Sequence, residues 1–186
     1  MNTPNIPNIV IEKINLDRFD DFYNAFLESS KEWFASGMIP KPDLSRDEME
    51  YMIKSFIALW EPDNTYMFYA LDEKTNQIVG IAFLNHINRT HQIGNLGYLV
   101  RTSRTGEGIA TEAARLVAQY GFEKLGLQRL EIVVHPDNAP SLKVAEKLGA
   151  TREALLRNRE LLHGVPCSAY MHSLIPADFS INKTAA

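Results

Sequence analysis

A loop with two glycines and two arginines connects a short apolar run to an amphipathic helix near the middle of the chain. The loop extends from Arg101 to Gly108, follows the apolar run 93–100, and precedes apolar residues at helical spacing from Ile109 onward. The first amides of a helix have no acceptor within the helix, so they can bind phosphate groups. Glycines allow close approach of the backbone, and arginines add positive charge. The segment predicts a phosphate or pyrophosphate site, although a plain strand-to-helix turn can have the same residues.

Two other nucleotide-binding motifs are alternatives for this loop. Gly106 and Gly108 would supply two of the three glycines of a dinucleotide fingerprint. However, Thr111 stands where the third glycine should be, and five residues separate the apolar run from Gly106, where that fingerprint begins almost at once. A P-loop is excluded because no Gly-Lys-Ser/Thr sequence follows the glycines.

A second polar segment lies one predicted strand further along the chain. It contains Asn138 and Ser141 at the start of a predicted helix, and both residue types are common helix caps. Together with Gly97-Tyr98, the run GEGIATEA from Gly106 to Ala113, and EKLG from Glu146 to Gly149, this segment resembles the GNAT superfamily of acyl-CoA-dependent N-acyltransferases. Within that superfamily it is similar to the RimJ/RimL-like branch, which acetylates protein N-termini. The resemblance covers roughly residues 9–176.

The resemblance implies how acetyl-CoA would bind. In this family the strand from Tyr98 to Arg101 splays from its neighbour, and its free backbone groups bond the pantetheine arm as an added strand would. Amides from Thr105 to Ala110 would hold the pyrophosphate, and Asn138 would bond the pantetheine on its other side. The implied cofactor-binding residues are Leu99, Val100, Arg101, Arg104, Thr105, Gly106, Glu107, Gly108, Ile109, Ala110, Thr111 and Asn138.

Two residues are the predicted catalytic groups. The resemblance places Ser141 near the thioester sulfur, as an acid or hydrogen-bond donor. Glu160 is the first candidate for the base that deprotonates the amine, directly or through water, although it could simply face solvent. His86 and His172 are the next candidates.

The chain departs from the family pattern at four positions. The loop motif of relatives usually begins with glutamine or arginine, where this chain has Thr105, and Arg104 one residue earlier could compensate. Many relatives carry a glutamate on the strand before Gly-Tyr, where this chain has Asn95. Ser168 and His172 stand where the last strands of relatives commonly have aspartate and tyrosine. Cofactor binding is therefore better supported by the residues than the catalytic details are.

The expected reaction is the transfer of an acetyl group from acetyl-CoA to a primary amine. An α-amine has a pKa of about 7.7 to 8.0 and a lysine amine one of about 10.4, so an α-amine needs less help from a base. We therefore expect the N-terminal α-amine of a protein, such as a ribosomal protein, as the acceptor. Acetylation of a small amine, such as a polyamine or an antibiotic, and a non-catalytic CoA-binding sensor are the alternatives.

A mixed α/β fold must position these residues. Three closely linked runs, 66–71, 77–84 and 93–100, alternate as strands do and predict an antiparallel meander. Helical and strand patterns alternate in the second half, at 108–125, 130–134, 140–148, 154–162 and 169–175, the last two joined at 163–166. The sequence predicts one GNAT-like α/β domain over residues 8–176, with a mixed sheet, splayed central strands and about four helices. Residues 1–7 and 177–186 are expected to be flexible ends.

Two helices are predicted before the meander. The first begins near Asp17, and the second begins at a capping box formed by Ser45 and Glu48. Their aromatic and methionine side chains could line a substrate groove, but their spacing favours core packing.

Composition narrows the classes of function. The 186 residues are 45% hydrophobic and 23% charged, as expected for one globular domain. A net charge of −4 gives no basic field for nucleic acid, and no apolar run reaches the roughly 18 residues of a membrane span. The single cysteine, Cys167, cannot form an internal disulfide, and the five histidines show no metal-ligand spacing. We expect a cytoplasmic protein without a metal, a nucleic-acid partner or a membrane partner, and a homodimer is left open.

Overall fold

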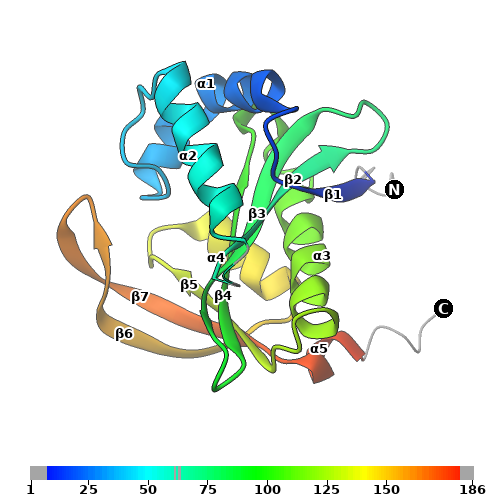
Figure 1. Ribbon diagram of the computed structural model, residues 1–186. Helices are drawn as coiled ribbons and strands as arrows, with labels where there is room; N and C mark the ends of the chain where they lie inside the picture. The colour runs from blue at the N-terminus through cyan, green and yellow to red at the C-terminus, as the bar shows by residue number, and fades with distance from the viewer. Residues whose placement is uncertain (1–7, 61, 63, 181–186) are drawn as a thin grey trace, which may run out of the picture.

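The computed structural model describes residues 8–60, 62 and 64–180. These residues form a seven-stranded mixed sheet with helices on both faces (Figure 1). The strands are β1 (Ile9–Lys13), β2 (Tyr66–Asp72), β3 (Ile78–Asn88), β4 (Ile93–Val100), β5 (Arg129–Val134), β6 (Thr151–Leu162) and β7 (Val165–Leu174). The helices are α1 (Phe19–Ala35), α2 (Arg46–Ala58), the 3₁₀ turn η1 (Thr102–Arg104), α3 (Ile109–Glu123), α4 (Ala139–Lys147) and α5 (Pro176–Ser180).

The strands follow the order β1-β2-β3-β4-β5-β7-β6 across the sheet. The first four pair antiparallel with their neighbours in sequence. Helix α3 then crosses over, so that β5 lies parallel to β4, and β7 pairs antiparallel with both β5 and β6. The predicted α/β class, antiparallel in the first half and connected by a crossover in the second, is confirmed.

Each face of the sheet has its own apolar core. Helices α3 and α4 cover one face, and α1 and α2 cover the other. Side chains of neighbouring strand residues point to opposite faces. Accordingly, Tyr98 of β4 packs against the α3 core, and Leu99 packs against the α1 and α2 core. Strand β4 therefore contributes side chains to the apolar cores on both faces of the sheet.

Helix α2 begins with the predicted capping box. The Ser45 hydroxyl accepts the Glu48 amide at 3.2 Å, and the Glu48 carboxylate accepts the Ser45 amide at 2.8 Å. The capping box thus gives a partner to two amides at this helix start, as the local sequence indicates.

The last hairpin has a shorter turn than the four residues predicted. Only His163 and Gly164 join β6 to β7, and both have positive φ, 50° and 82°, as two-residue hairpin turns require. Residues 165 and 166 belong to β7 instead. Pro166 fits there because β5 pairs with β7 only from Tyr170 to Leu174, so the missing N–H breaks no bond to β5.

A fifth helix ends the described chain, where about four helices were predicted in total. Residues 177–180, predicted as part of a flexible tail, lie in α5. Phe179 contacts Phe122 of α3 with ring centroids 5.4 Å apart, and this contact anchors the short helix. The other predicted flexible residues, 1–7 and 181–186, lie outside the described residues.

Candidate active site

Strands β4 and β5 diverge after a short paired stretch. They pair only from Ile93 with Arg129 to Asn95 with Glu131, whereas β4 continues beside β3 as far as Val100. Within the described sheet, the edge of β4 that faces β5 therefore has no strand partner from Leu96 onward. The predicted splay of the central strands is confirmed. An extended ligand can hydrogen-bond to such an edge as an added strand would.

The far end of this open edge is fixed to the rest of the protein. The Val100 carbonyl accepts a hydrogen bond from Trp33 Nε1 at 3.0 Å, and the Arg101 amide donates to the Val79 carbonyl at 2.9 Å. These contacts hold the strand end against α1 and β3. Binding of pantetheine by the backbone of Leu99, Val100 and Arg101 remains a prediction, with these two groups already partnered.

The loop before α3 ends in a run of backbone amides without acceptors. The amides of residues 102–105 are hydrogen-bonded within the protein, including that of Thr105 to the Thr102 carbonyl at 3.3 Å. Among the described residues, the amides from 106 to 111 have no acceptor, and the first helical bond is donated by Glu112 to the Gly108 carbonyl at 3.1 Å. Both loop glycines have positive φ, and a Cβ added at Gly106 would meet open space. The positive end of α3 and this open space fit the phosphate groups of CoA.

The two loop arginines pair with carboxylates. Arg101 Nε lies 2.7 Å from Glu28 Oε2, and Arg104 Nη2 lies 2.9 Å from Asp72 Oδ2 and 2.8 Å from Glu107 Oε2. Hydrogen bonds from Ser103 and Arg101 lower the pKa of Glu28 to about 2, and the hydrogen bond from Arg104 lowers the pKa of Asp72. These ion pairs brace the loop against α1 and β2. The predicted contact of the two arginines and Glu107 with CoA stays a prediction.

Ser141 faces Tyr98 across the gap between β4 and β5. The Tyr98 hydroxyl lies 3.0 Å from Ser141 Oγ and donates to the Ser141 carbonyl at 3.2 Å. Burial raises the pKa of Tyr98 to about 12, so its phenol is protonated at neutral pH. Sequence reasoning singled out Tyr98 in a motif but missed this contact, because no local signal joins residues 43 positions apart.

Asn138 is the cap of α4. Its Oδ1 accepts the Ser141 amide at 3.2 Å. Capping of α4 thus uses the Ser141 amide and not its hydroxyl, which is paired with the Tyr98 phenol. Binding of pantetheine by Asn138 is untested and remains a prediction.

Glu160 lies on β6 where the pairing of β6 and β7 becomes irregular. The register shifts between Leu156 and Glu160, and the Glu160 side chain is half-buried. The Cys167 thiol donates to the Glu160 carbonyl at 3.7 Å. In the part of the chain that the structure describes, no hydrogen bond joins Glu160 to Ser141, so the predicted acid and base are not in direct contact. The role of Glu160 as base stays a prediction.

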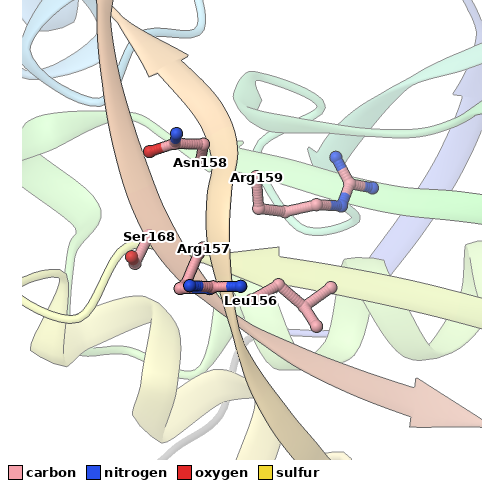
Figure 2. A pocket seen from close by; sticks show the side chains of 5 residues that line it. All are labelled: Leu156, Arg157, Asn158, Arg159 and Ser168. Carbon is pink, nitrogen blue, oxygen red and sulfur yellow. The ribbon is translucent and has the colours of Figure 1, made fainter.

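An open pocket of about 760 Å³ borders the same irregular stretch (Figure 2). It is lined by Leu156, Arg157, Asn158, Arg159 and Ser168. Asn158 has a φ of 51°, and its side chain and that of Arg159 extend to opposite sides of β6 (Figure 2). Ser168, the predicted departure from the family pattern, thus lies at the rim of a polar depression.

The two histidines considered as bases lie in different settings. His86 is exposed on β3 with a φ of 50°. His172 is buried, its Nδ1 has no hydrogen-bond partner, and burial lowers its pKa. Neither histidine contacts Ser141 through a hydrogen bond among the described residues.

An apolar cavity of about 290 Å³ lies on the other face of β4, beneath α1 and α2. It is lined by Phe22, Phe26, Trp33, Gly37, Met38, Ile39, Met49, Met52, Phe56, Thr65, Met67, Ile81, Phe83, Asn85 and Leu99. Asn85 accepts a hydrogen bond from Asn95 Nδ2 at 2.8 Å. The predicted core packing of the first two helices is confirmed, and the same side chains also enclose this cavity.

Comparison with known proteins decides the family. A family model described as an acetyltransferase (GNAT) domain matches residues 8–151. The chain belongs to this family. The resemblance in the glycine loop and around Ser141 thus reflects membership of the GNAT acetyltransferases, which use acetyl-CoA.

Several N-acetyltransferases are similar to part of the chain. The uncharacterized N-acetyltransferase p20 of Bacillus licheniformis is 32% identical over 113 residues, which are 61% of this chain and 64% of that protein. The spermidine N(1)-acetyltransferase of Escherichia coli (strain K12) is 31% identical over 85 residues, 46% of each chain. The matched segments thus span less than two thirds of the length of these relatives.

Solved structures share the fold over nearly the whole chain. The structure of a proposed ribosomal-protein-serine acetyltransferase from Vibrio cholerae has a TM-score of 0.77 and 28% identity, with 94% of this chain and 100% of that chain covered. Mycobacterium smegmatis RimJ in complex with CoA-disulfide has a TM-score of 0.82 and 20% identity, with 91% and 83% covered. The second likeness shows the fold alone.

Among the described residues, no group of three or more histidine, cysteine, aspartate or glutamate side chains is arranged to hold a metal ion. None of the described helices is long and apolar enough to cross a membrane.

Proposed function

We propose that this chain transfers an acetyl group from acetyl-CoA to the α-amine of a protein N-terminus, such as that of a ribosomal protein. The observation that carries the proposal is the open edge of β4. This edge runs from Leu96 to Val100, includes Tyr98 with its contact to Ser141, and leads into the loop whose last amides are unpartnered. The edge would take the pantetheine arm, the amides would take the pyrophosphate, and Ser141 would lie near the thioester.

The residues account for both proton transfers of the reaction. The amine nitrogen forms a bond to the thioester carbon, the carbon–sulfur bond breaks, and the products are an acetylated amine and the thiol of CoA. The amine loses one proton, which Glu160 would accept through water and release to solvent, and the departing thiolate gains one through the Ser141 hydroxyl, which takes a replacement proton from solvent. The Tyr98 phenol donates to the Ser141 carbonyl and can accept a hydrogen bond from the Ser141 hydroxyl, which positions that hydroxyl in the gap.

The choice of an α-amine rests on the weakness of the available base. Asn95 cannot accept a proton, and its amide is hydrogen-bonded to Asn85. At pH 7.5, roughly a quarter of an α-amine of pKa about 8 is neutral, against about one in a thousand for an amine of pKa about 10.4. A site with a distant base can therefore use an α-amine more readily. The likeness to a proposed ribosomal-protein-serine acetyltransferase supports a protein as the acceptor.

A polyamine is the second candidate acceptor, because a spermidine N(1)-acetyltransferase is among the relatives. Mass spectrometry of products separates the two. We expect a peptide with a free N-terminus and an internal lysine to gain one acetyl group, on the α-amine. Acetylation of spermidine with an unmodified peptide would contradict the proposal, and CoA binding without thiol release and without acetylation of either acceptor would point to a CoA-binding sensor.

A further inference from the structure

The apolar cavity beneath α1 and α2 lies beside the proposed transfer site. Leu99 lines the cavity, and its neighbour Tyr98 contacts Ser141 on the opposite face of β4. Both residues belong to the stretch of β4 that has left β5. A group bound at the open edge of β4 would therefore lie next to the same strand that forms one wall of the cavity.

Polar groups in the cavity lie at the end nearest the last β4–β5 pair. Asn85 lines the cavity and is hydrogen-bonded to Asn95, and Asn95 pairs with Glu131 of β5. The cavity thus has an amide-bearing end at the point where the gap opens and an apolar remainder beneath the two helices. An amine at the polar end would carry its apolar substituent into that remainder.

The chemistry of the walls defines what the cavity can bind. Among the described residues that line it, none is charged, and apart from Thr65 and Asn85 they are aromatic, aliphatic, methionine or glycine. A second ammonium group placed there would lose its hydration without gaining a carboxylate partner. Burial of an apolar side chain in such a site is favourable, because it removes apolar surface from water. The flexible side chains of the four methionines can adapt to different shapes.

The last hairpin packs beside one wall of the cavity. Gly37 lines the cavity with φ 76°, and a Cβ added to it would come within 3.0 Å of Leu162 Cδ1. Phe34 stacks against His163 with ring centroids 4.3 Å apart. The turn of the β6–β7 hairpin therefore packs against the end of α1 and the corner that follows it, next to one wall of the cavity.

We infer that this cavity receives a large apolar side chain on the first residue of the acceptor, such as leucine, methionine or phenylalanine. This inference rests on the proposed α-amine function. The cavity has a volume of about 290 Å³, at the lower end for ligand pockets. This volume suits a single side chain and not a longer stretch of peptide.

A peptide series tests the inference without any variant. The peptides differ only in the first residue, which is leucine, methionine, phenylalanine, serine, alanine or aspartate, and spermidine and isoamylamine are included. With saturating acetyl-CoA at pH 8, we expect kcat/KM for the three large apolar residues to exceed that for serine and alanine by roughly ten- to two-hundred-fold. Equal values, or a preference for serine, would overturn the inference and leave the α-amine function intact.

Spermidine, isoamylamine and a parallel assay with hexanoyl-CoA in place of acetyl-CoA test other possible occupants of the cavity. Spermidine acetylated faster than every peptide would overturn the proposed function itself. Isoamylamine acetylated as well as the leucine peptide would show that a free apolar amine is the substrate and would overturn the assignment to a peptide. Efficient use of hexanoyl-CoA without any preference among peptides would assign the cavity to the acyl chain instead, against the inference.

A pair of variants on α2 tests the location. Met52 is half-buried and lines the cavity, and Tyr51 beside it is 76% exposed. Met52→Trp should fill the cavity and reduce the preference for leucine over alanine at least several-fold, whereas Tyr51→Trp should keep the preference of the unaltered chain. A preference that persists in folded Met52→Trp protein would overturn the assignment of the cavity.

Discussion

Capping and chemistry fall on two different residues at the start of α4. Asn138 caps the helix through the Ser141 amide, while the Ser141 hydroxyl lies 3.0 Å from the Tyr98 phenol. The sequence left capping as an explanation for both residues, because either type can cap a helix. Only the contact across the gap, between residues distant in sequence, separates the two roles.

Ser141→Ala should reduce activity far more than stability. The loss of a general acid costs roughly a hundred- to ten-thousand-fold in kcat, while the lost hydrogen bond to Tyr98 is worth about 1 kcal/mol in the free energy of unfolding. Asn138→Ala provides the comparison, since loss of the cap should cost about 1 kcal/mol of stability. Measurement of kcat and of urea unfolding for both variants separates an effect on catalysis from one on stability. A Ser141→Ala protein that keeps its activity but is destabilised would show that Ser141 has a structural role only.

At the scale of elements, the start of α3 combines a positive helix end with unpartnered amides. Ala110 lies in its first turn. An aspartate there is favoured by the helix dipole, by about 0.3 to 1 kcal/mol, but would repel a bound pyrophosphate. We expect Ala110→Asp to keep or raise the melting temperature and to weaken CoA binding roughly ten-fold or more, since charges about 4 Å apart interact by about 1 to 4 kcal/mol.

Ala110→Asn is the matched control, because it has nearly the same shape without the charge. Calorimetric titration with CoA should give an affinity for Ala110→Asn much closer to that of the unaltered chain. Identical affinities for the Asp and Asn variants would show that the phosphates bind elsewhere.

The loop itself is held to α1 by an acid whose ionisation matters at low pH. Glu28 accepts hydrogen bonds from Arg101 and Ser103, and its pKa is about 2 in the folded chain against an ordinary value of 4.5. A lowered pKa adds stability above pH 4.5, and that stability is lost as the pH falls toward 2. Glu28→Gln should therefore lose less unfolding free energy between pH 6 and pH 3 than the unaltered chain does. Glu146→Gln, on an exposed position of α4, should behave like the unaltered chain in the same urea titrations.

At the scale of the whole molecule, local signals predicted the elements and long-range contacts decided the details. The meander, the crossover and the capping box at Ser45 follow from periodicity and turn residues, which act within a few positions. The ion-pair partners of Arg101 and Arg104 could not be predicted from local patterns. Glu28 lies 73 positions from Arg101, and Asp72 lies 32 positions from Arg104. For the same reason, the aromatic and methionine residues of α1 and α2 predicted a core, and the cavity they enclose became visible only in the folded chain.

The central proposal is that the acceptor is an α-amine, and the pH dependence of kcat/KM for two kinds of amine tests this proposal most directly. The measurement is kcat/KM for the best N-terminal peptide and for spermidine, from pH 6.5 to 9.5 with saturating acetyl-CoA. Because far more of an α-amine than of an aliphatic polyamine is neutral at pH 7.5, we predict a higher kcat/KM for the peptide there, with the gap narrowing as the pH rises. A kcat/KM for spermidine above that of the peptide at pH 7.5 would contradict the account.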